Sequence, residues 1–241
     1  MKTLKNKVAY VTGGSKGIGY GVAESLIKEG VNVVITSRNK QSADKAANEL
    51  NGKGHPGKVV GVEADVREID AQAKAVAVAN EHFGPVDYVI ANAGVGHFAP
   101  IEELTAEQWQ QTIDINLTGV FNTVKAGLED LKKTEGYLLT IASLAGTNFF
   151  AKGSAYNASK FGLVGFTQAV MMDVRQYGVK VSTIMPGSVA THFNGNQPDE
   201  KDAWKIQSED IGQMVVDLIK MPARTLPSKV EVRPAMPPVK G

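Results

Sequence analysis

The sequence predicts an α/β protein with a doubly wound parallel sheet of about seven strands and helices on both faces. Short runs rich in β-branched residues alternate with longer amphipathic runs, which is the pattern of repeated β-α-β units. Most of the short runs are apolar throughout, as in a parallel sheet that is covered on both faces. The length of 241 residues fits a single domain over residues 1–241, without internal repeats or long linkers.

The expected elements follow one another at regular spacing. Strands are expected at residues 8–12, 31–36, 58–63, 86–91, 137–142 and 179–185, with a weaker one at 229–233. Helices are expected at residues 17–29, 40–50, 67–83, 106–132, 154–177 and 208–220, several ending near a chain-breaking glycine. Two stretches depart from this alternation. Residues 191–204 are polar and are interpreted as a lid, and the Pro-rich residues 234–241 as an ordered tail or subunit contact; mobile surface is the alternative for both.

Composition argues against several classes of function. Lys plus Arg number 26 and Asp plus Glu number 25, a balance that disfavours binding to nucleic acid through phosphates or to a membrane through a basic surface. The chain has no cysteine, which excludes disulfides and thiolate chemistry, and its four histidines show no metal-ligand spacing. No run approaches the roughly 20 apolar residues that span a bilayer, and the polar residues 1–7 do not resemble a signal peptide. We therefore expect a cytoplasmic protein without a metal.

A glycine-rich turn follows the first expected strand and begins the first expected helix. It reads Thr12-Gly13-Gly14-Ser15-Lys16-Gly17-Ile18-Gly19. Glycine permits a tight turn and lets backbone N–H groups approach a pyrophosphate at a helix N-terminus. Such a turn alone is a weak signal, but its place in an α/β pattern favours a dinucleotide site and a Rossmann-type sheet.

The end of the second expected strand favours NADP(H) over NAD(H). An acid there accepts a hydrogen bond from the adenosine 2′-hydroxyl, whereas an Arg accommodates a 2′-phosphate. Residues 31–42 contain no Asp or Glu, the strand is followed by Ser37 and Arg38, and Lys16 lies in the glycine-rich turn. Both cations can bind phosphate. Two solvated surface cations are the alternative interpretation.

The third and fourth strands are followed by further candidates for cofactor binding. Asp65, which precedes Val66, can accept a hydrogen bond from an adenine amino group or cap the helix that begins near residue 67, and the two roles are compatible. The fourth strand is followed by Asn92-Ala93-Gly94, where small residues let a cofactor lie close to the backbone.

The residues for chemistry are expected at the fifth and sixth strands. Tyr156 and Lys160 lie at positions i and i+4 of one helix, and Ser143 follows the fifth strand. Ligands of open α/β sheets bind at the carboxyl ends of the strands. A nearby ammonium lowers the pKa of a phenol, and a serine hydroxyl can hydrogen-bond a carbonyl oxygen, so these are the groups needed for hydride transfer between a nicotinamide and a carbonyl. Pro186-Gly187 forms a turn that suits the nicotinamide end of a cofactor.

In the order of these motifs the chain resembles the short-chain dehydrogenases/reductases, specifically their compact single-domain branch. The resemblance covers roughly residues 4–191. The matching positions are Thr12, Gly13, Gly17, Gly19, Asp65-Val66, Asn92-Ala93-Gly94, Asn116, Ser143, Tyr156, Lys160, Pro186-Gly187 and Thr191. The family's usual Asn-Asn-Ala-Gly begins with Ala91 in this sequence, which is a mild variation.

The resemblance implies a role for each residue of the site. Tyr156 is implied to be the catalytic acid/base, with Lys160 lowering its pKa and holding the nicotinamide ribose, Ser143 orienting the substrate oxygen, and Asn116 supporting a water-mediated relay to Lys160. The full set of expected cofactor contacts is Gly13, Ser15, Lys16, Gly17, Ile18, Gly19, Ser37, Arg38, Asp65, Val66, Asn92, Ala93, Gly94, Tyr156, Lys160, Pro186, Gly187, Val189 and Thr191.

The substrate is less well defined by the sequence. Candidate pocket residues include Val95, Gly96, His97, Phe98, Leu144, Ala145, Phe149, Phe150, Ser188, His192 and Phe193, a mixture that suggests a partly apolar cavity for a small ketone, aldehyde or hydroxy acid. A 3-oxoacyl-[acyl-carrier-protein] reductase is the alternative, disfavoured by Met172-Asp173-Val174 and by an ending without the usual Gly-Gly. A non-catalytic NADP-binding sensor is a remote third, because such proteins typically lose the Tyr or Lys. The extended, epimerase-like branch is also disfavoured.

Family resemblance also implies a homotetramer or a dimer. The two long helices expected at residues 106–132 and 154–177 are the candidate contact surface. Their apolar residues are equally well explained as core within one chain, so the sequence leaves the oligomer number open.

Overall fold

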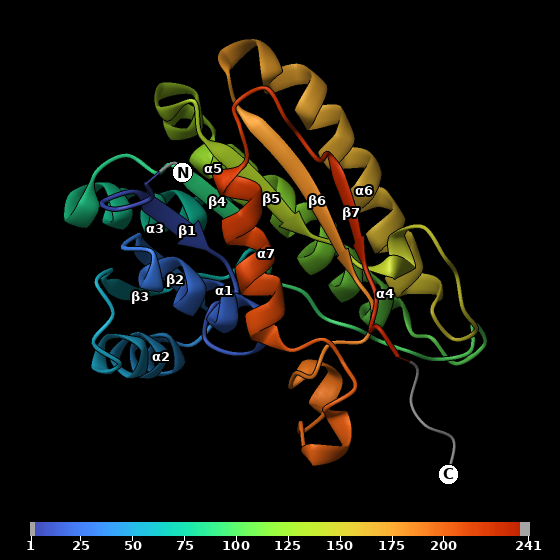
Figure 1. Ribbon diagram of the computed structural model, residues 1–241. Coiled ribbons are helices and arrows are strands. Elements are labelled where there is room, and N and C mark those ends of the chain that lie inside the picture. Colours follow the sequence, from blue (N-terminus) through green and yellow to red (C-terminus); the bar gives the residue numbers. More distant parts are fainter. Residues whose placement is uncertain (1–2, 237–241) are drawn as a thin grey trace.

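The computed structural model describes residues 3–236 and contains one parallel sheet of seven strands in the order β3-β2-β1-β4-β5-β6-β7 (Figure 1). This confirms the predicted fold class and the weak seventh strand, which pairs with β6 from Lys229 to Val232. The strands are β1 Val8–Val11, β2 Asn32–Ser37, β3 Val59–Glu63, β4 Tyr88–Ala91, β5 Tyr137–Ile141, β6 Lys180–Pro186 and β7 Lys229–Val232.

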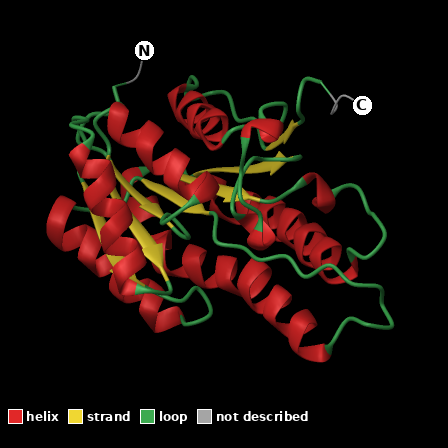
Figure 2. Cartoon of the chain, turned by 90° about the horizontal axis from the view of Figure 1, so that it is seen from below, coloured by secondary structure: helices red, strands yellow, loops and turns green. Residues whose placement is uncertain are grey.

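The strands bury side chains on both faces, as their apolar sequences predict. Ala9 and Val11 of β1 belong to one core, and Val8 and Tyr10 to the other, because successive side chains of a strand point to opposite faces. The first core packs against helices α1 Gly17–Lys28, α2 Lys40–Gly52 and α7 Ser208–Lys220. The second packs against α3 Ile69–Phe83, α5 Gly119–Thr134 and α6 Ser154–Val174. Figure 2 shows these helices on both sides of the strands.

One expected helix is interrupted. The sequence predicts a continuous helix over residues 106–132, whereas the structure has α4 Ala106–Ile113, a π-helical turn Asp114–Thr118 and then α5. The buried Asn116 lies in this turn. Its side chain accepts a hydrogen bond from Val95 N–H at 2.8 Å and donates one to Val95 C=O at 2.9 Å. A π-helical turn reorients a side chain out of the regular helix, and such turns recur at functional sites.

The helix expected at residues 67–83 also begins later, at Ile69. Asp65 is the reason, because its carboxylate accepts the backbone N–H of Arg67 at 3.0 Å and its carbonyl accepts that of Glu68 at 3.1 Å. These bonds form a turn ahead of the helix, so Asp65 stabilises the turn before the helix start.

The expected lid has ordered ends. Val189 and Ile206 form a parallel bridge at its base, and between them lie two short 3₁₀ turns, Phe193–Gly195 and Glu200–Asp202. Thr191 packs over the glycine-rich turn, since a Cβ at Gly17 would lie 3.4 Å from its Cβ. Most of the expected C-terminal tail, residues 237–241, lies outside the described residues.

Candidate active site

A cavity of about 1090 Å³ lies at the carboxyl ends of the strands. In the sheet order β1 is flanked by β2 and β4, and this reversal of strand order is where open α/β sheets bind ligands. All predicted cofactor and substrate residues line the cavity except Gly19 and Asp65, and Asn116 lies behind its wall. Lining residues that were not predicted from the sequence include Gln111, Ile115, Asn148, Lys205 and Arg233.

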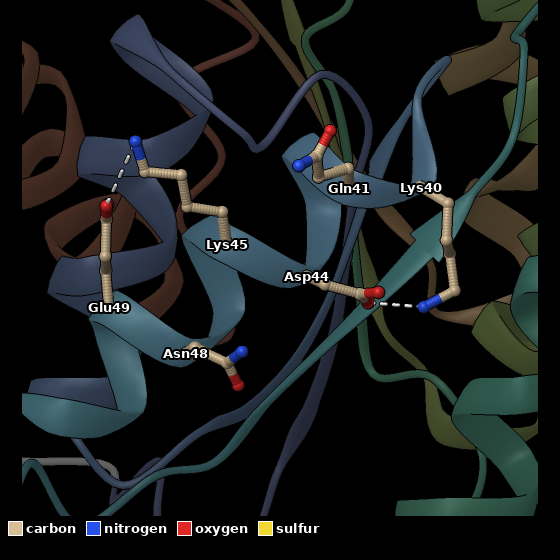
Figure 3. Close-up of a pocket in the computed structure, with 6 residues that line it drawn as sticks. All are labelled: Lys40, Gln41, Asp44, Lys45, Asn48 and Glu49. Atoms are coloured by element: carbon tan, nitrogen blue, oxygen red, sulfur yellow. Dashed lines mark hydrogen bonds and ion pairs between the residues drawn. The ribbon is translucent and has the colours of Figure 1, made fainter.

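A second, open hollow lies on the outer face of α2 (Figure 3). It is lined by Lys40, Gln41, Asp44, Lys45, Asn48 and Glu49. Lys40 pairs with Asp44, and Lys45 with Glu49 at 3.9 Å, each one helical turn away. These are ordinary ion pairs between neighbouring turns of a solvent-exposed helix. They account for the charged residues of the hollow, which therefore gives no indication of a catalytic site.

The glycine-rich turn has a backbone that requires glycine. Gly13 and Gly17 have φ of 65° and 57°, which side chains rarely adopt. A Cβ at Gly19 would lie 2.4 Å from the Gly13 carbonyl oxygen, so this glycine permits close packing of the turn. Asn92 secures it from β4, donating to Thr12 C=O at 2.9 Å. The turn therefore brings the N-terminus of α1 to the cavity, where its N–H groups favour an anion such as a pyrophosphate.

The charge of the cavity is one-sided. Among its described lining residues are Lys16, Arg38, Lys160, Lys205 and Arg233, and none is Asp or Glu. Lys205 and Arg233 pair with acids outside the cavity, at 2.6 and 3.0 Å. Lys16 and Arg38, by contrast, are exposed and form no ion pair within residues 3–236. This end of the cavity therefore suits a phosphate-bearing ligand.

Asp65 is held by a neighbour. Arg67 donates from Nη2 to its Oδ2 at 2.6 Å and from Nε to its Oδ1 at 3.0 Å. This pairing with Arg67 keeps the pKa of the Asp65 carboxyl below its usual range. The carboxylate does not line the cavity, so the adenine contact stays a prediction.

The groups expected to do chemistry converge at the other end. Tyr156 lies in the first turn of α6, near enough to Ser143, which follows β5, for the serine side chain to affect the pKa of its hydroxyl. Lys160 Nζ lies 5.7 Å from the centre of the Tyr156 ring and donates to the Ile141 carbonyl at 3.0 Å. Helix spacing and strand order thus bring these side chains, two from α6 and one from the end of β5, to one end of the cavity.

Burial shifts the pKa of both titratable groups away from the charged form. It raises the pKa of Tyr156, with the hydrogen bond to Ser143 opposing this. It lowers the pKa of Lys160 to about 8. The direction for Tyr156 is opposite to the lowered pKa that the sequence predicts, because the loss of hydration on burial is the largest effect on this hydroxyl.

We expect burial of Lys160 to make stability depend on pH. Between pH 8 and 10.5 the unfolded chain holds a proton on this amine that the folded chain releases, so the unfolding free energy rises with pH. Relative to Lys160→Met, the parent should gain about 3 kcal/mol across this range. Urea titrations of both proteins at several pH values measure the difference. A difference that stays constant with pH would contradict the lowered pKa.

Asn116 lies behind the pair of Tyr156 and Lys160. Besides its bonds to Val95, it donates to the buried Ser159 Oγ at 3.0 Å. A Cβ at Gly94 would lie 3.3 Å from Asn116 Oδ1 and 3.8 Å from Lys160 Nζ, so the two side chains flank one point. The relay role of Asn116 stays a prediction.

The predicted pocket side chains occupy the same end but differ in exposure. His97 is engaged by Gln111, with 2.6 Å between Nε2 and Oε1. Phe193 packs against Tyr156, whereas Phe149 is 87% exposed and His192 also faces solvent. Two of the lining residues that were not predicted differ in how they could have been found. Arg233 directly follows β7, and its position at the carboxyl end of a strand could have indicated it. Gln111 lies within α4, and nothing in its position along the chain indicates the cavity.

Residues 3–236 also lack two further kinds of feature. No helix there is long and apolar enough to cross a membrane. No group of three or more His, Asp or Glu in that range is placed to hold a metal ion.

Comparison with known proteins agrees with this geometry. The chain matches the short chain dehydrogenase family over residues 7–202. An uncharacterized oxidoreductase of Staphylococcus epidermidis is 33% identical over 236 residues, 97% of this chain and 100% of that protein. The structure of an alcohol dehydrogenase from Thermococcus sibiricus, complexed with 5-hydroxy-NADP, has a TM-score of 0.87 at 30% identity over 95% of this chain and 97% of that chain. A 3-ketoacyl-ACP reductase from Sinorhizobium meliloti 1021 has a TM-score of 0.85 at 29% identity over 94% and 97%. The chain therefore belongs to the short-chain dehydrogenases/reductases, oxidoreductases that use a nicotinamide cofactor and act on small molecules.

Proposed function

We propose that the protein is an NADP(H)-dependent oxidoreductase that interconverts a small carbonyl compound (a ketone, an aldehyde or a hydroxy acid's oxo form) and its alcohol. The observation that carries this proposal is one continuous cavity with phosphate-binding features at one end and Ser143, Tyr156 and Lys160 at the other. In this arrangement a bound dinucleotide would extend from the glycine-rich turn to the tyrosine.

The residues present fit the cofactor. The positive-φ glycines 13 and 17 leave space for a pyrophosphate, and Arg38 with Lys16 would bind a 2′-phosphate. Asn92-Ala93-Gly94, Pro186, Gly187, Val189 and Thr191 would contact the nicotinamide half. When bound, the cofactor supplies or accepts the hydride at the substrate carbon.

The chain's own groups manage the oxygen of the substrate. In the reductive direction the Tyr156 hydroxyl gives its proton to the carbonyl oxygen as an alkoxide develops, and the same group takes it back in oxidation. The Ser143 hydroxyl donates a hydrogen bond to that oxygen and so stabilises the developing charge. Protonated Lys160 beside the ring favours the transient tyrosinate and would hold the nicotinamide ribose. Asn116 would support proton delivery to Lys160 through water.

An acyl-carrier-protein reductase is the second candidate, favoured by the likeness to the Sinorhizobium meliloti reductase. Two departures disfavour it. Residues 172–174 of α6 read Met172-Asp173-Val174, where an acid replaces the cation that would attract an acidic carrier, and β7 is followed by Arg233-Pro234 rather than by a Gly-Gly ending. A sensor without catalysis is disfavoured because all four residues Asn116, Ser143, Tyr156 and Lys160 are present.

The experiment is NADPH consumption with a panel of free ketones, aldehydes and 3-oxo acids beside an acetoacetyl thioester. Turnover of the free carbonyl compounds supports the proposal, and turnover confined to the thioester supports the second candidate. Tight NADPH binding without any turnover would favour the sensor.

We also propose that the chain forms a homo-oligomer, a dimer or tetramer, in the cytoplasm. Phe121 of α5 and Phe161 of α6 are each 44% exposed, and burial of such apolar surface drives association. Sedimentation is expected to give a particle of at least two chains, and replacing both phenylalanines with Glu should produce monomers. A monomeric parent would contradict this proposal.

A further inference from the structure

Two phenylalanines from separate segments pack against Tyr156, and a third packs against one of these two. Phe98 follows β4, Phe150 precedes α6, and Phe193 lies in the segment 191–204. The ring centres of Phe98 and Phe193 lie 5.3 and 5.8 Å from that of Tyr156, and Phe98 is 5.8 Å from Phe150 and 6.4 Å from Phe193. These are tilted or edge-to-face contacts, the arrangements that aromatic rings prefer.

The backbone around these rings fixes their positions. Ala99 N–H donates to Lys152 C=O at 3.0 Å, which joins the segment of Phe98 to that of Phe150. Asn157 of α6 binds the second segment, donating to Asn148 C=O at 2.7 Å. Gly96 lets both rings approach the backbone, because a Cβ there would lie 2.8 Å from the rings of Phe98 and Phe193 and would displace them. The rings therefore form a supported wall.

This wall of three phenylalanine rings exposes apolar surface to the cavity beside Tyr156. Phe98 and Phe150 are 38% and 48% exposed although both line the cavity. The imidazole of His97 is turned to Gln111, and no described residue that lines the cavity is acidic. A substrate whose oxygen meets the Tyr156 hydroxyl would place its carbon substituent against ring faces and edges.

We propose that the substrates of this site carry an aromatic ring on, or one carbon away from, the carbinol or carbonyl carbon. The proposal rests on the proposed carbonyl chemistry and names its substrate class. A substrate ring can join the existing network of tilted contacts, each of which favours an aromatic partner over an aliphatic one beyond the area buried. A wall that acted through hydrophobicity alone would favour saturated analogues, because these are more apolar than a phenyl ring.

The test compares three methyl ketones of equal carbon number, phenylacetone, cyclohexylacetone and nonan-2-one, with NADPH as reductant. None of their carbonyl groups is conjugated, so intrinsic reactivity is matched. Phenylacetone is expected to have a kcat/KM about tenfold above that of cyclohexylacetone. Phe98→Leu and, separately, Phe193→Leu should reduce this ratio to about twofold. Phe83→Leu on α3, outside the cavity, should retain it. A ratio measured within one enzyme does not depend on how much of a variant is folded.

Each other outcome overturns the inference in a distinguishable way. Butan-2-one, which has no ring, serves as the reporter of the proposed function. Suppose that reduction of butan-2-one requires Tyr156, but that the kcat/KM of cyclohexylacetone or nonan-2-one equals that of phenylacetone. The proposed aromatic substrate class is then wrong, and the proposed function stands. An acetoacetyl thioester with a higher kcat/KM than phenylacetone assigns the pocket to acyl chains. Lack of Tyr156-dependent turnover with every ketone overturns the proposed function and this inference together.

Discussion

Replacing Tyr156 with Phe should lower the turnover of any carbonyl substrate by about 1000-fold while NADPH still binds. The substitution removes one oxygen near Ser143, and it leaves a ring of the same shape against Phe98 and Phe193. Without that hydroxyl, the developing alkoxide keeps the hydrogen bond from Ser143 but loses the group that is proposed to transfer a proton to it. Steady-state NADPH consumption gives the loss of turnover, and NADPH fluorescence titration gives the affinity.

Tyr177→Phe provides a matched control for this experiment. Tyr177 lies in the 3₁₀ turn that follows α6, is 46% exposed, contacts Lys132 through its ring and does not line the cavity, so the loss of its hydroxyl should leave turnover unchanged. Turnover of Tyr156→Phe within about tenfold of the parent would assign the proton to another group.

Much of the fold was predictable because local chemistry and tertiary structure agree. The uniformly apolar run of β1 has residues in both cores, and such a run has few alternatives to a covered parallel strand. Even the partly exposed β7 was indicated by its alternating Val230 and Val232. The interruption at Asn116 was not predictable, because it depends on hydrogen bonds to Val95, which lies 21 residues earlier in the chain. A helical pattern contains no information about such a partner.

The residues of the candidate site likewise divide into those that the local sequence predicts and those that depend on tertiary packing. Residues that follow a strand or a glycine-rich turn were found because position alone brings them to the carboxyl edge of the sheet, as with Arg38 and Ser143. Gln111 reaches the cavity through the orientation of α4, which packing against α6 decides. The pKa of Tyr156 could not be predicted either, since spacing along a helix indicates a neighbouring ammonium but not the depth of burial.

Arg38 is expected to decide the choice between the two nicotinamide cofactors. We predict that NADPH binds at least about tenfold more tightly than NADH, because a 2′-phosphate can form charge-assisted hydrogen bonds with Arg38 and Lys16. Arg38→Asp should weaken the binding of NADPH by about 100-fold and strengthen the binding of NADH. The new carboxylate repels the 2′-phosphate of NADPH and accepts a hydrogen bond from the 2′-hydroxyl of NADH. Dissociation constants for both cofactors, measured on parent and variant, give the reversal directly.

The matched control for charge is Lys45→Asp, which makes the same change of sign on the outer face of α2. Lys45 is 77% exposed and pairs with Glu49, and water and salt screen a charge there from the cavity. The Lys45→Asp variant should therefore prefer NADPH over NADH to the same extent as the parent protein. If the preference comes from contact with phosphate, it should also decrease as ionic strength rises, whereas NADH affinity should change little. Equal affinities of the parent for NADPH and NADH would show that Arg38 and Lys16 are ordinary surface cations. The absence of an acid after β2 would then have no bearing on the cofactor.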